Sequence, residues 1–113
     1  MSKTNSVRLI GRFGVSPELK TINTETCVSS FSFATNDSKR NADGTNSKTT
    51  EWHNVICFNS LAKLVTKHCK QGDQASLEGR LRTRKYDYQN GVTRYATEII
   101  LEEILFLSSK HEN

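Results

Sequence analysis

The amino-acid sequence predicts an all-β domain with one helix, in which five strands form a barrel and the helix lies between the third and fourth strands. Three observations carry this prediction. Most segments alternate apolar and polar residues with a period of two, as strands with one buried face do. The segment 61–69 instead repeats apolar residues at helical spacing. Asn90 and Gly91 stand between two alternating segments, and this dipeptide is a strong signal for a β-hairpin.

The length of the chain, 113 residues, fits one domain that buries its core without metal or disulfide support. We predict a single domain over 1–113, with its core at about 5–107 and a short tail at 108–113. The formal net charge of +4 is a modest excess that many proteins share. Composition alone therefore does not identify a partner, and local clusters of charge carry more information.

Cysteine spacing and the apolar runs exclude several classes of protein. Cys27, Cys57 and Cys69 are odd in number and lack metal-ligand spacing, so we expect core residues in a reducing compartment and predict no metal site and no cofactor. The start of the chain has no apolar stretch of the kind that a signal peptide needs, and the longest unbroken apolar run is 104–107. We therefore expect neither secretion nor a membrane span.

Three strands fill the first half of the chain. The first is Val7 to Phe13, which ends before the only proline, Pro17. A short extended piece at Glu18 to Ile22 leads to the second strand, Cys27 to Asn36, where apolar residues and serines alternate. The third strand is Thr49 to Phe58.

The segment DSKRNADGTNSK at 37–48 contains one apolar residue, Ala42. We predict a mobile polar loop, because a stretch of about 12 residues without structure of its own is uncommon in compact domains and is usually functional or mobile. Lys39 and Arg40 make it a candidate binding loop, and a solubilising hairpin tip is the alternative.

One helix and two strands fill the second half. The helical spacing at 61–69 predicts a helix with Ser60 as its N-cap and Gly72 just past its end. A strand at Gln74 to Tyr86 and a final strand at about Val92 to Leu107 follow. The stretch EIILEEILFL in the final strand would also suit a helix, but the hairpin directly before it favours a strand.

Side chains of the fourth strand alternate between a cationic and an apolar face. One face carries Arg80, Arg82, Arg84 and Tyr86, and the other carries Leu77, Gly79, Leu81 and Thr83. With Lys85, four of the sixteen basic residues fall within six positions. Such a cluster indicates a polyanion or a membrane surface as partner, and a solvated strand face is the alternative.

A two-residue turn at Asn90 and Gly91 would place Tyr86 opposite Tyr95. The same register sets Ile99 opposite Arg82, which mixes apolar and charged groups on one face. We therefore predict a β-bulge or strong coiling at this point, as where a sheet closes into a barrel.

Five strands with a helix between the third and fourth form the layout of the OB-fold, a Greek-key barrel that binds oligonucleotides or oligosaccharides. Proteins that hold single strands without reading sequence need cations along a groove and aromatic rings for base stacking. Trp52 and Phe58 share a face of the third strand, and Tyr86 ends the cationic stripe. A place in the core is the alternative for Phe58. We assign Phe31 and Phe33 to the core.

Four motifs, in this order and spacing, resemble the bacterial and mitochondrial single-stranded DNA-binding protein family over about residues 5–107. They are TEWHNV (50–55), FNSLA (58–62), LEGRLRTRK (77–85) and RYATE (94–98). The resemblance implies an OB-fold that assembles as a homotetramer, with a dimer as the alternative. It also implies a protein that binds and protects single-stranded DNA without sequence specificity in replication, recombination and repair, and that is not an enzyme.

The resemblance also assigns roles to particular residues. Trp52, Phe58 and Tyr86 occupy positions where the family stacks bases, with Tyr86 in place of the usual tryptophan, and Arg82, Arg84 and Lys85 match backbone-contacting positions. Arg80 stands where the family varies and is a candidate through its place on the stripe. His53 matches a histidine associated with subunit contacts.

Three features depart from the family pattern. Lys39 lies about where many members have a loop tryptophan, so a stacking platform is missing there or is exchanged for a phosphate contact. Ser76 stands where many have tyrosine, so the family's tetramer contact is altered at this position. The chain ends at SSKHEN and not in the acidic, hydrophobic tip of many bacterial members, so recruitment of replication and repair proteins through a tail is not supported.

The resemblance implies a cytoplasmic, nucleoid-associated protein without a membrane partner, and the mitochondrial matrix is the alternative location. A protein-interaction module of the primosome type, with DNA binding as a secondary property, is the alternative function on the same barrel. A nuclease or metalloenzyme is not expected, because the acidic residues and the Cys and His spacing form no metal-binding group.

Overall fold

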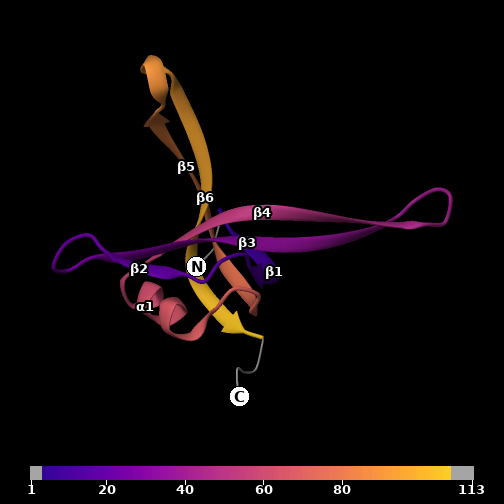
Figure 1. The fold of residues 1–113 in the computed structure, drawn as a ribbon, viewed down its shortest axis with the longest axis horizontal. Coiled ribbons are helices and arrows are strands. Elements are labelled where there is room, and N and C mark those ends of the chain that lie inside the picture. The colour runs from indigo at the N-terminus through magenta and orange to yellow at the C-terminus, as the bar shows by residue number, and fades with distance from the viewer. Residues whose placement is uncertain (1–3, 108–113) are drawn as a thin grey trace.

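The computed structural model describes residues 4–107, which form six strands, one α-helix and one short 3₁₀ turn (Figure 1). The elements in chain order are β1 (Val7–Phe13), β2 (Glu18–Thr21), β3 (Cys27–Arg40), β4 (Asn46–Phe58), α1 (Asn59–His68), β5 (Gln74–Asp87), the turn η1 (Gln89–Gly91) and β6 (Thr93–Phe106). The predicted tail at 108–113 lies outside the described residues.

Five of the strands close into a barrel. They lie in the order β1-β5-β6-β4-β3, and β1 also pairs with β3 at Phe13 and Phe33, which joins the two ends of the sheet. The pairing of β4 with β6, centred on Val55 and Ile99, is parallel, and the other pairings are antiparallel. The expected extended piece before β3 is the short strand β2 on the edge of β3. The predicted fold, a five-stranded barrel with a helix between its third and fourth strands, is confirmed.

The core fills the inside of this barrel. Phe31 and Phe33 lie in it, as the alternation of β3 predicts, and the ring of Phe33 meets that of Phe13 edge to face at 5.5 Å between centroids. All three cysteines are free and buried there. Burial raises the pKa of Cys57 and of Cys69 to about 12, so both thiols stay protonated and unreactive.

The helix α1 begins two residues earlier than predicted. Asn59 takes a positive φ of 56° at the junction with β4, and its side-chain oxygen accepts a hydrogen bond from the backbone N–H of Cys27 at 3.1 Å. Ser60 therefore lies inside the helix, and the predicted Ser60 cap is wrong. Ala62 and Val65 are the buried residues of α1. No helix within residues 4–107 combines the length and the hydropathy that a membrane crossing requires.

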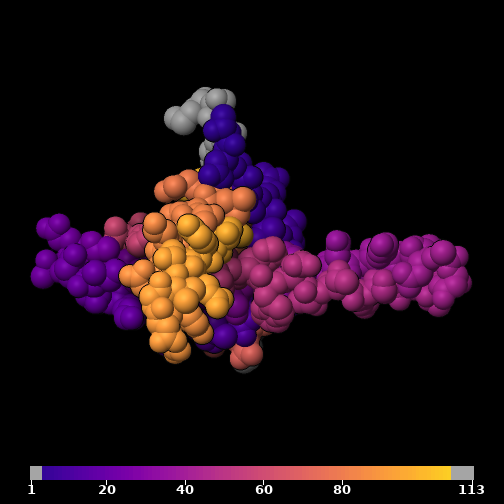
Figure 2. All heavy atoms as spheres, turned by 90° about the horizontal axis from the view of Figure 1, so that it is seen from above, coloured from indigo at the N-terminus to yellow at the C-terminus, as the bar shows by residue number. Residues whose placement is uncertain are grey.

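The hairpin of β3 and β4 extends beyond the barrel as a long two-stranded arm, which projects to one side in Figures 1 and 2. The prediction of a loop over 37–48 is wrong for most of its length, because ladder pairs continue from Asp37 with Thr49 to Arg40 with Asn46. Only the turn between the strands is irregular. An arm without a core beneath it buries neither face, so both faces are polar and the alternation that marks a strand is lost. Mobility of this segment stays a prediction.

The hairpin of β5 and β6 forms a second arm, which Figure 2 views almost along its length. Its loop holds three residues, since the N–H of Tyr88 donates to the carbonyl of Val92 at 2.6 Å. Asn90 and Gly91, which the sequence places in the turn, both take positive φ values. The extra loop residue shifts the register by one, so the predicted pair of Tyr86 with Tyr95 is wrong and Tyr86 faces Arg94.

A register shift interrupts the pairing of β5 with β6 near the barrel. Glu78 pairs with Glu103, while Gly79 pairs with Leu101, so Glu102 is the extra residue of a bulge. The sequence predicts a bulge slightly nearer the arm, because the expected register sets Ile99 opposite Arg82. The observed register does not contain that pair. Arg82 faces Glu98, and the apolar Ile99 faces Leu81.

Barrel closure depends on a close approach at Gly11, and we expect Gly11→Ala to destabilise the fold. A Cβ at Gly11 would overlap the backbone carbonyl of Ala34 on β3, and backbone cannot rotate away as a side chain can. Overpacking of this kind costs about 1–3 kcal/mol of the free energy of unfolding. Denaturant unfolding followed by circular dichroism measures it, with Lys48→Ala on the exposed arm as control. Equal midpoints for the two variants would contradict the closure argument.

Candidate nucleic-acid interface

Trp52 lies on the outer face of β4, where it exposes 62% of its surface. Alternation sends Val55 and Cys57 into the core and turns Trp52 outward. The ring lies against Gly14, where a Cβ would come within 2.4 Å of the Trp52 Cζ3 atom. Phe58, on the same side of β4, is half-buried at the start of α1. The side chain of Trp52 is therefore accessible to a ligand, whereas that of Phe58 is only partly accessible.

A groove of about 330 Å³ runs over the outer face between the β3–β4 and β5–β6 hairpins. Hydroxyl and amide groups of β3 and β4 line one part, including those of Ser32 and Asn54. Arg84 of β5 and Glu98 of β6 line another. Apolar residues, among them Phe31 and Ile56, complete the lining. A shallow groove with polar, charged and apolar groups on an outer face suits an extended ligand better than a compact apolar one.

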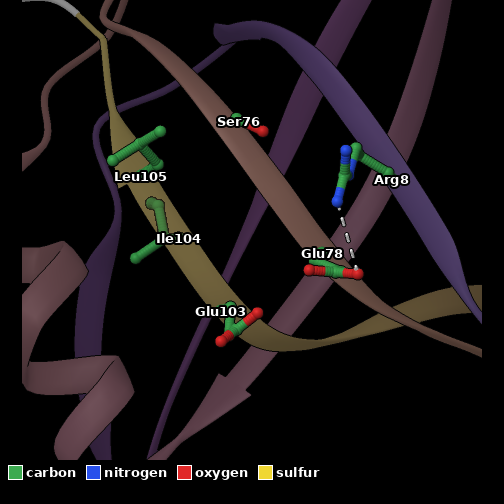
Figure 3. Close-up of a pocket in the computed structure, with 6 residues that line it drawn as sticks. All are labelled: Arg8, Ser76, Glu78, Glu103, Ile104 and Leu105. Atoms are coloured by element: carbon green, nitrogen blue, oxygen red, sulfur yellow. Dashed lines mark ion pairs between the residues drawn. The ribbon is translucent and has the colours of Figure 1, made fainter.

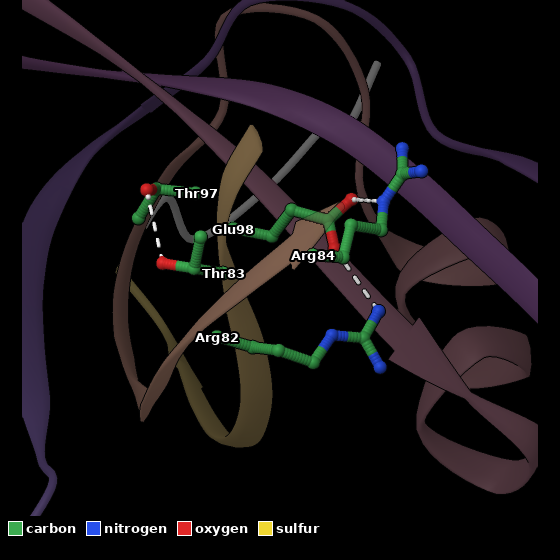
Figure 4. A network of polar contacts seen from close by, with 5 residues as sticks. All are labelled: Arg82, Thr83, Arg84, Thr97 and Glu98. Carbon is green, nitrogen blue, oxygen red and sulfur yellow. Dashed lines mark hydrogen bonds and ion pairs between the residues drawn. The ribbon is translucent and has the colours of Figure 1, made fainter. Parts of the chain in front are cut away.

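Arg84 belongs to the stripe of arginines on β5, and each guanidinium group of the stripe contacts a carboxylate. Figure 4 shows the contacts of Arg82 and Arg84. The Nη2 atom of Arg82 lies 3.0 Å from Oε1 of Glu98, and the Nε atom of Arg84 lies 3.1 Å from Oε2 of the same carboxylate. Arg80 pairs with Glu102 at 3.4 Å. The stripe is therefore less positive than the sequence suggests, with three cations held against two carboxylates.

Glu98 exposes only 9% of its surface, although it lies on the outer side of the barrel. Burial by itself would raise the pKa of this carboxyl group. Hydrogen bonds from Arg82 and Arg84, together with their charges, outweigh burial and hold the pKa of Glu98 below its ordinary value. Sequence reasoning missed Glu98, and a correct hairpin register would have found it directly opposite Arg82.

Aromatic and cationic side chains alternate along the β5–β6 arm. Arg84 lies over the ring of Tyr86, with its Cζ atom 5.6 Å from the ring centroid, and Arg94 lies over Tyr88 at 4.6 Å. Tyr86 exposes 38% of its surface. Tyr88 and Arg94 escaped the sequence analysis because the predicted register did not bring them together.

The other face of the same arm carries Lys85 and Tyr95, which are cross-strand partners. Tyr95 exposes 68% of its surface, the largest share among the exposed large apolar and aromatic residues from 4 to 107. Lys85 was predicted to act with the arginine cluster, and alternation places it on the opposite side of the strand from Arg84 and Tyr86.

Lys39 and Arg40 lie near the end of the β3–β4 arm, where they pair with Ser47 and Asn46, and they do not line the groove. His53 is half-buried on β4, and its Nε2 atom lies 2.9 Å from the hydroxyl of Thr35. Of the predicted site residues, only Arg84 lines the groove, and the others lie on the barrel strands beside it or on the two arms.

A second hollow of about 450 Å³ lies over β1, β5 and β6 (Figure 3). Arg8 contacts Glu78 there at 3.9 Å, and Glu78 faces Glu103 across the two strands. Ser76 and the exposed Leu105 also line it. The facing carboxylates make this hollow a poor site for a polyanion. Within residues 4–107, no group of three or more His, Cys, Asp or Glu side chains could hold a metal ion.

Comparison with known proteins places this chain among single-strand binding proteins. Residues 4–107 match the model of the single-strand binding protein family. A single-stranded DNA-binding protein of Bacteroides thetaiotaomicron is 42% identical over 111 residues, which cover 96% of this chain and 69% of that protein. The corresponding protein of Neisseria meningitidis serogroup A is 36% identical over 109 residues, which cover 96% of this chain and 63% of that protein.

A solved structure supports the same comparison. It is a Plasmodium falciparum SSB in complex with single-stranded DNA, with a TM-score of 0.84 and 31% sequence identity. The match covers 95% of this chain and 97% of the other. The shared fold therefore extends over nearly the whole of both chains.

Trp52, the only tryptophan, should report on its contact with Gly14. A Cβ at position 14 would also come within 2.5 Å of the Ser32 hydroxyl oxygen. We expect Gly14→Ala to turn the exposed indole ring away and to shift its fluorescence emission, at a smaller cost in stability than a clash with backbone, because both neighbours are side chains that can rotate. Emission spectra and thermal unfolding measure the two effects. Gly11→Ala is the contrasting variant, because its clash is with backbone. An unchanged emission spectrum of Gly14→Ala would place the ring elsewhere.

Glu98 should make stability depend on pH. Its pKa is depressed in the folded protein, so its ion pairs contribute fully above the ordinary carboxyl pKa and are lost as pH falls through the lower, folded value. We expect Glu98→Gln to lower the unfolding midpoint at pH 7, and the difference from the wild type to shrink by about pH 3. Thermal unfolding at both pH values measures this, and a constant difference would contradict it.

Proposed function

Because the chain belongs to the single-strand binding protein family, we propose that it binds and protects single-stranded DNA, without sequence preference and without catalysis. The observation that carries the proposal is the joint exposure of Trp52 and Tyr86 on two strands, β4 and β5, that border one groove, with Arg84 in the lining of that groove. As an extension of this proposal, we propose a role in replication, recombination and repair, which the resemblance to the family implies and which the names of the relatives do not state.

Binding would combine base stacking with phosphate contacts. Every base has a flat π-face, so stacking on Trp52 and Tyr86 tolerates any sequence and contributes about 1–3 kcal/mol per base. A guanidinium group has five N–H donors, and Glu98 accepts one from Arg82 and one from Arg84. Apart from the buried Nε atom of Arg82, the remaining donors can serve phosphate oxygens without displacement of the carboxylate.

Two further parts of the proposal are its assembly and its location. We propose a homotetramer, with the exposed apolar residues Ile10 and Leu105 over β1 and β6 as part of the contact surface. His53 remains a candidate for a subunit contact, and its bond to Thr35 would fix its ring. The bacterial relatives support a cytoplasmic location near the nucleoid.

Titration with oligo-dT tests the proposal, because stacking should quench the fluorescence of Trp52. We expect Tyr86→Ala to weaken binding with little change in its salt dependence. Arg84→Ala should reduce the slope of log K against log salt by less than one unit, since each neutralised phosphate contributes about 0.7 on single strands. Filter binding provides a measure that does not depend on tryptophan.

Four results would contradict parts of this proposal. Binding without quenching would remove Trp52 from the interface. Equal salt slopes for the wild type and Arg84→Ala would remove the phosphate contact at Arg84. Failure to bind oligo-dT at low salt, with binding to a helicase or primosome protein intact, would instead favour a protein-interaction module. Cleavage of labelled single strands in the presence of magnesium would contradict the absence of catalysis.

A further inference from the structure

The carboxylate of Glu98 is an unexpected group to find among the arginines of a surface for a polyanion. We infer that Glu98 is a positioning residue of this surface, which acts through Arg82 and Arg84 and, by way of Arg84, fixes Tyr86. This inference rests on the proposed binding of single-stranded DNA. It assigns the interface a residue that carries the same sign of charge as the ligand.

The contacts of Glu98 use each of its oxygens for a different arginine. Its position on the groove wall is fixed by burial, whereas both arginine side chains are partly exposed and long. Arg82 keeps its orientation even though its Nε atom is buried without a hydrogen-bond partner among the described residues. The contact with Glu98 is therefore what fixes Arg82.

Arg84 extends this arrangement to the aromatic platform. Its Nε atom is engaged by Glu98, and its guanidinium lies over the ring of Tyr86. Arg84 thus holds the ring of Tyr86, which exposes 38% of its surface and so remains accessible to a base. One buried carboxylate, in this way, sets the spacing between donors for phosphate and a ring for stacking, as Figure 4 shows for its contacts with both arginines.

Two physical effects oppose each other at this residue. Charge alone predicts that removal of a carboxylate from the groove tightens the binding of a polyanion. Preorganisation predicts the reverse, because two freed arginines have to be ordered again each time the ligand binds. Ordering two long side chains outweighs one partly screened charge, so we expect the loss of Glu98 to weaken binding. The opposite signs make the two effects separable by experiment.

The first test compares Glu98→Gln with Glu103→Gln in titrations with oligo-dT. Both variants gain one positive charge, but Glu103 lies in the second hollow and does not line the groove. We expect Glu98→Gln to bind about fivefold to tenfold more weakly than the wild type, and Glu103→Gln to bind as the wild type does or slightly more tightly. Wild-type or tighter binding by Glu98→Gln would overturn the inference.

The second test asks whether Glu98 acts through the arginines. In the Arg82→Ala/Arg84→Ala background the carboxylate has nothing to position and only repels phosphate, so Glu98→Gln should leave binding unchanged or tighten it at low salt. A merely structural role would weaken binding by the same factor in both backgrounds. That result would also overturn the inference.

Circular dichroism at the titration temperature establishes that each variant is folded. Glu98→Asp is the second variant if one of the others does not fold, because it keeps the charge while its shorter side chain cannot reach both arginines. Weaker binding by Glu98→Asp supports positioning, and wild-type binding contradicts it. Failure of the wild type to bind oligo-dT would contradict the proposed function itself, whereas a bound wild type with an unaffected Glu98→Gln contradicts only the role of Glu98.

Discussion

Closure of the barrel by β1 is the constraint on which the other features depend. β1 pairs with β5 along most of its length and with β3 at its end, so the five strands share one closed core. Closure confines the core residues to the inside of a small barrel. The two long hairpins then have to leave the barrel as arms, and their aromatic and cationic side chains face solvent without a structural need for burial.

Electrostatics on the outer face is balanced rather than strongly positive. Two unit charges about 4 Å apart in water interact by about 1 kcal/mol, and salt reduces this further for exposed groups. Ordering a long side chain at an interface costs about 0.5–1.5 kcal/mol, and Glu98 orders two arginines. The carboxylate of Glu98 is thus compatible with binding of a polyanion if it holds the guanidinium groups of Arg82 and Arg84 in place, although it partly neutralises their charge.

The sequence predicted the barrel, the positions of the strands in it and the shared face of Trp52 and Phe58, because a buried face imposes alternation on every strand that covers the core. Prediction from alternation failed where the strands extend beyond the core and no longer have a buried face. Residues 37–40 and 46–48 belong to strands without alternation, since nothing lies beneath them. The β5–β6 register depended on the number of loop residues, three instead of two, which no hydrophobic pattern marks on an exposed arm. Glu98 was missed for this reason alone.

The β5–β6 arm links stability to the proposed function. An isolated two-stranded hairpin is marginally stable in water, so the order of this arm depends on cross-strand contacts. Those contacts include the hydroxyls of Thr83 and Thr97 at 3.3 Å, and the arginines that lie over Tyr86 and Tyr88. Several of the same groups would contact a bound strand. A ligand that binds only the ordered arm stabilises it by mass action, so binding and ordering of the arm are one coupled equilibrium.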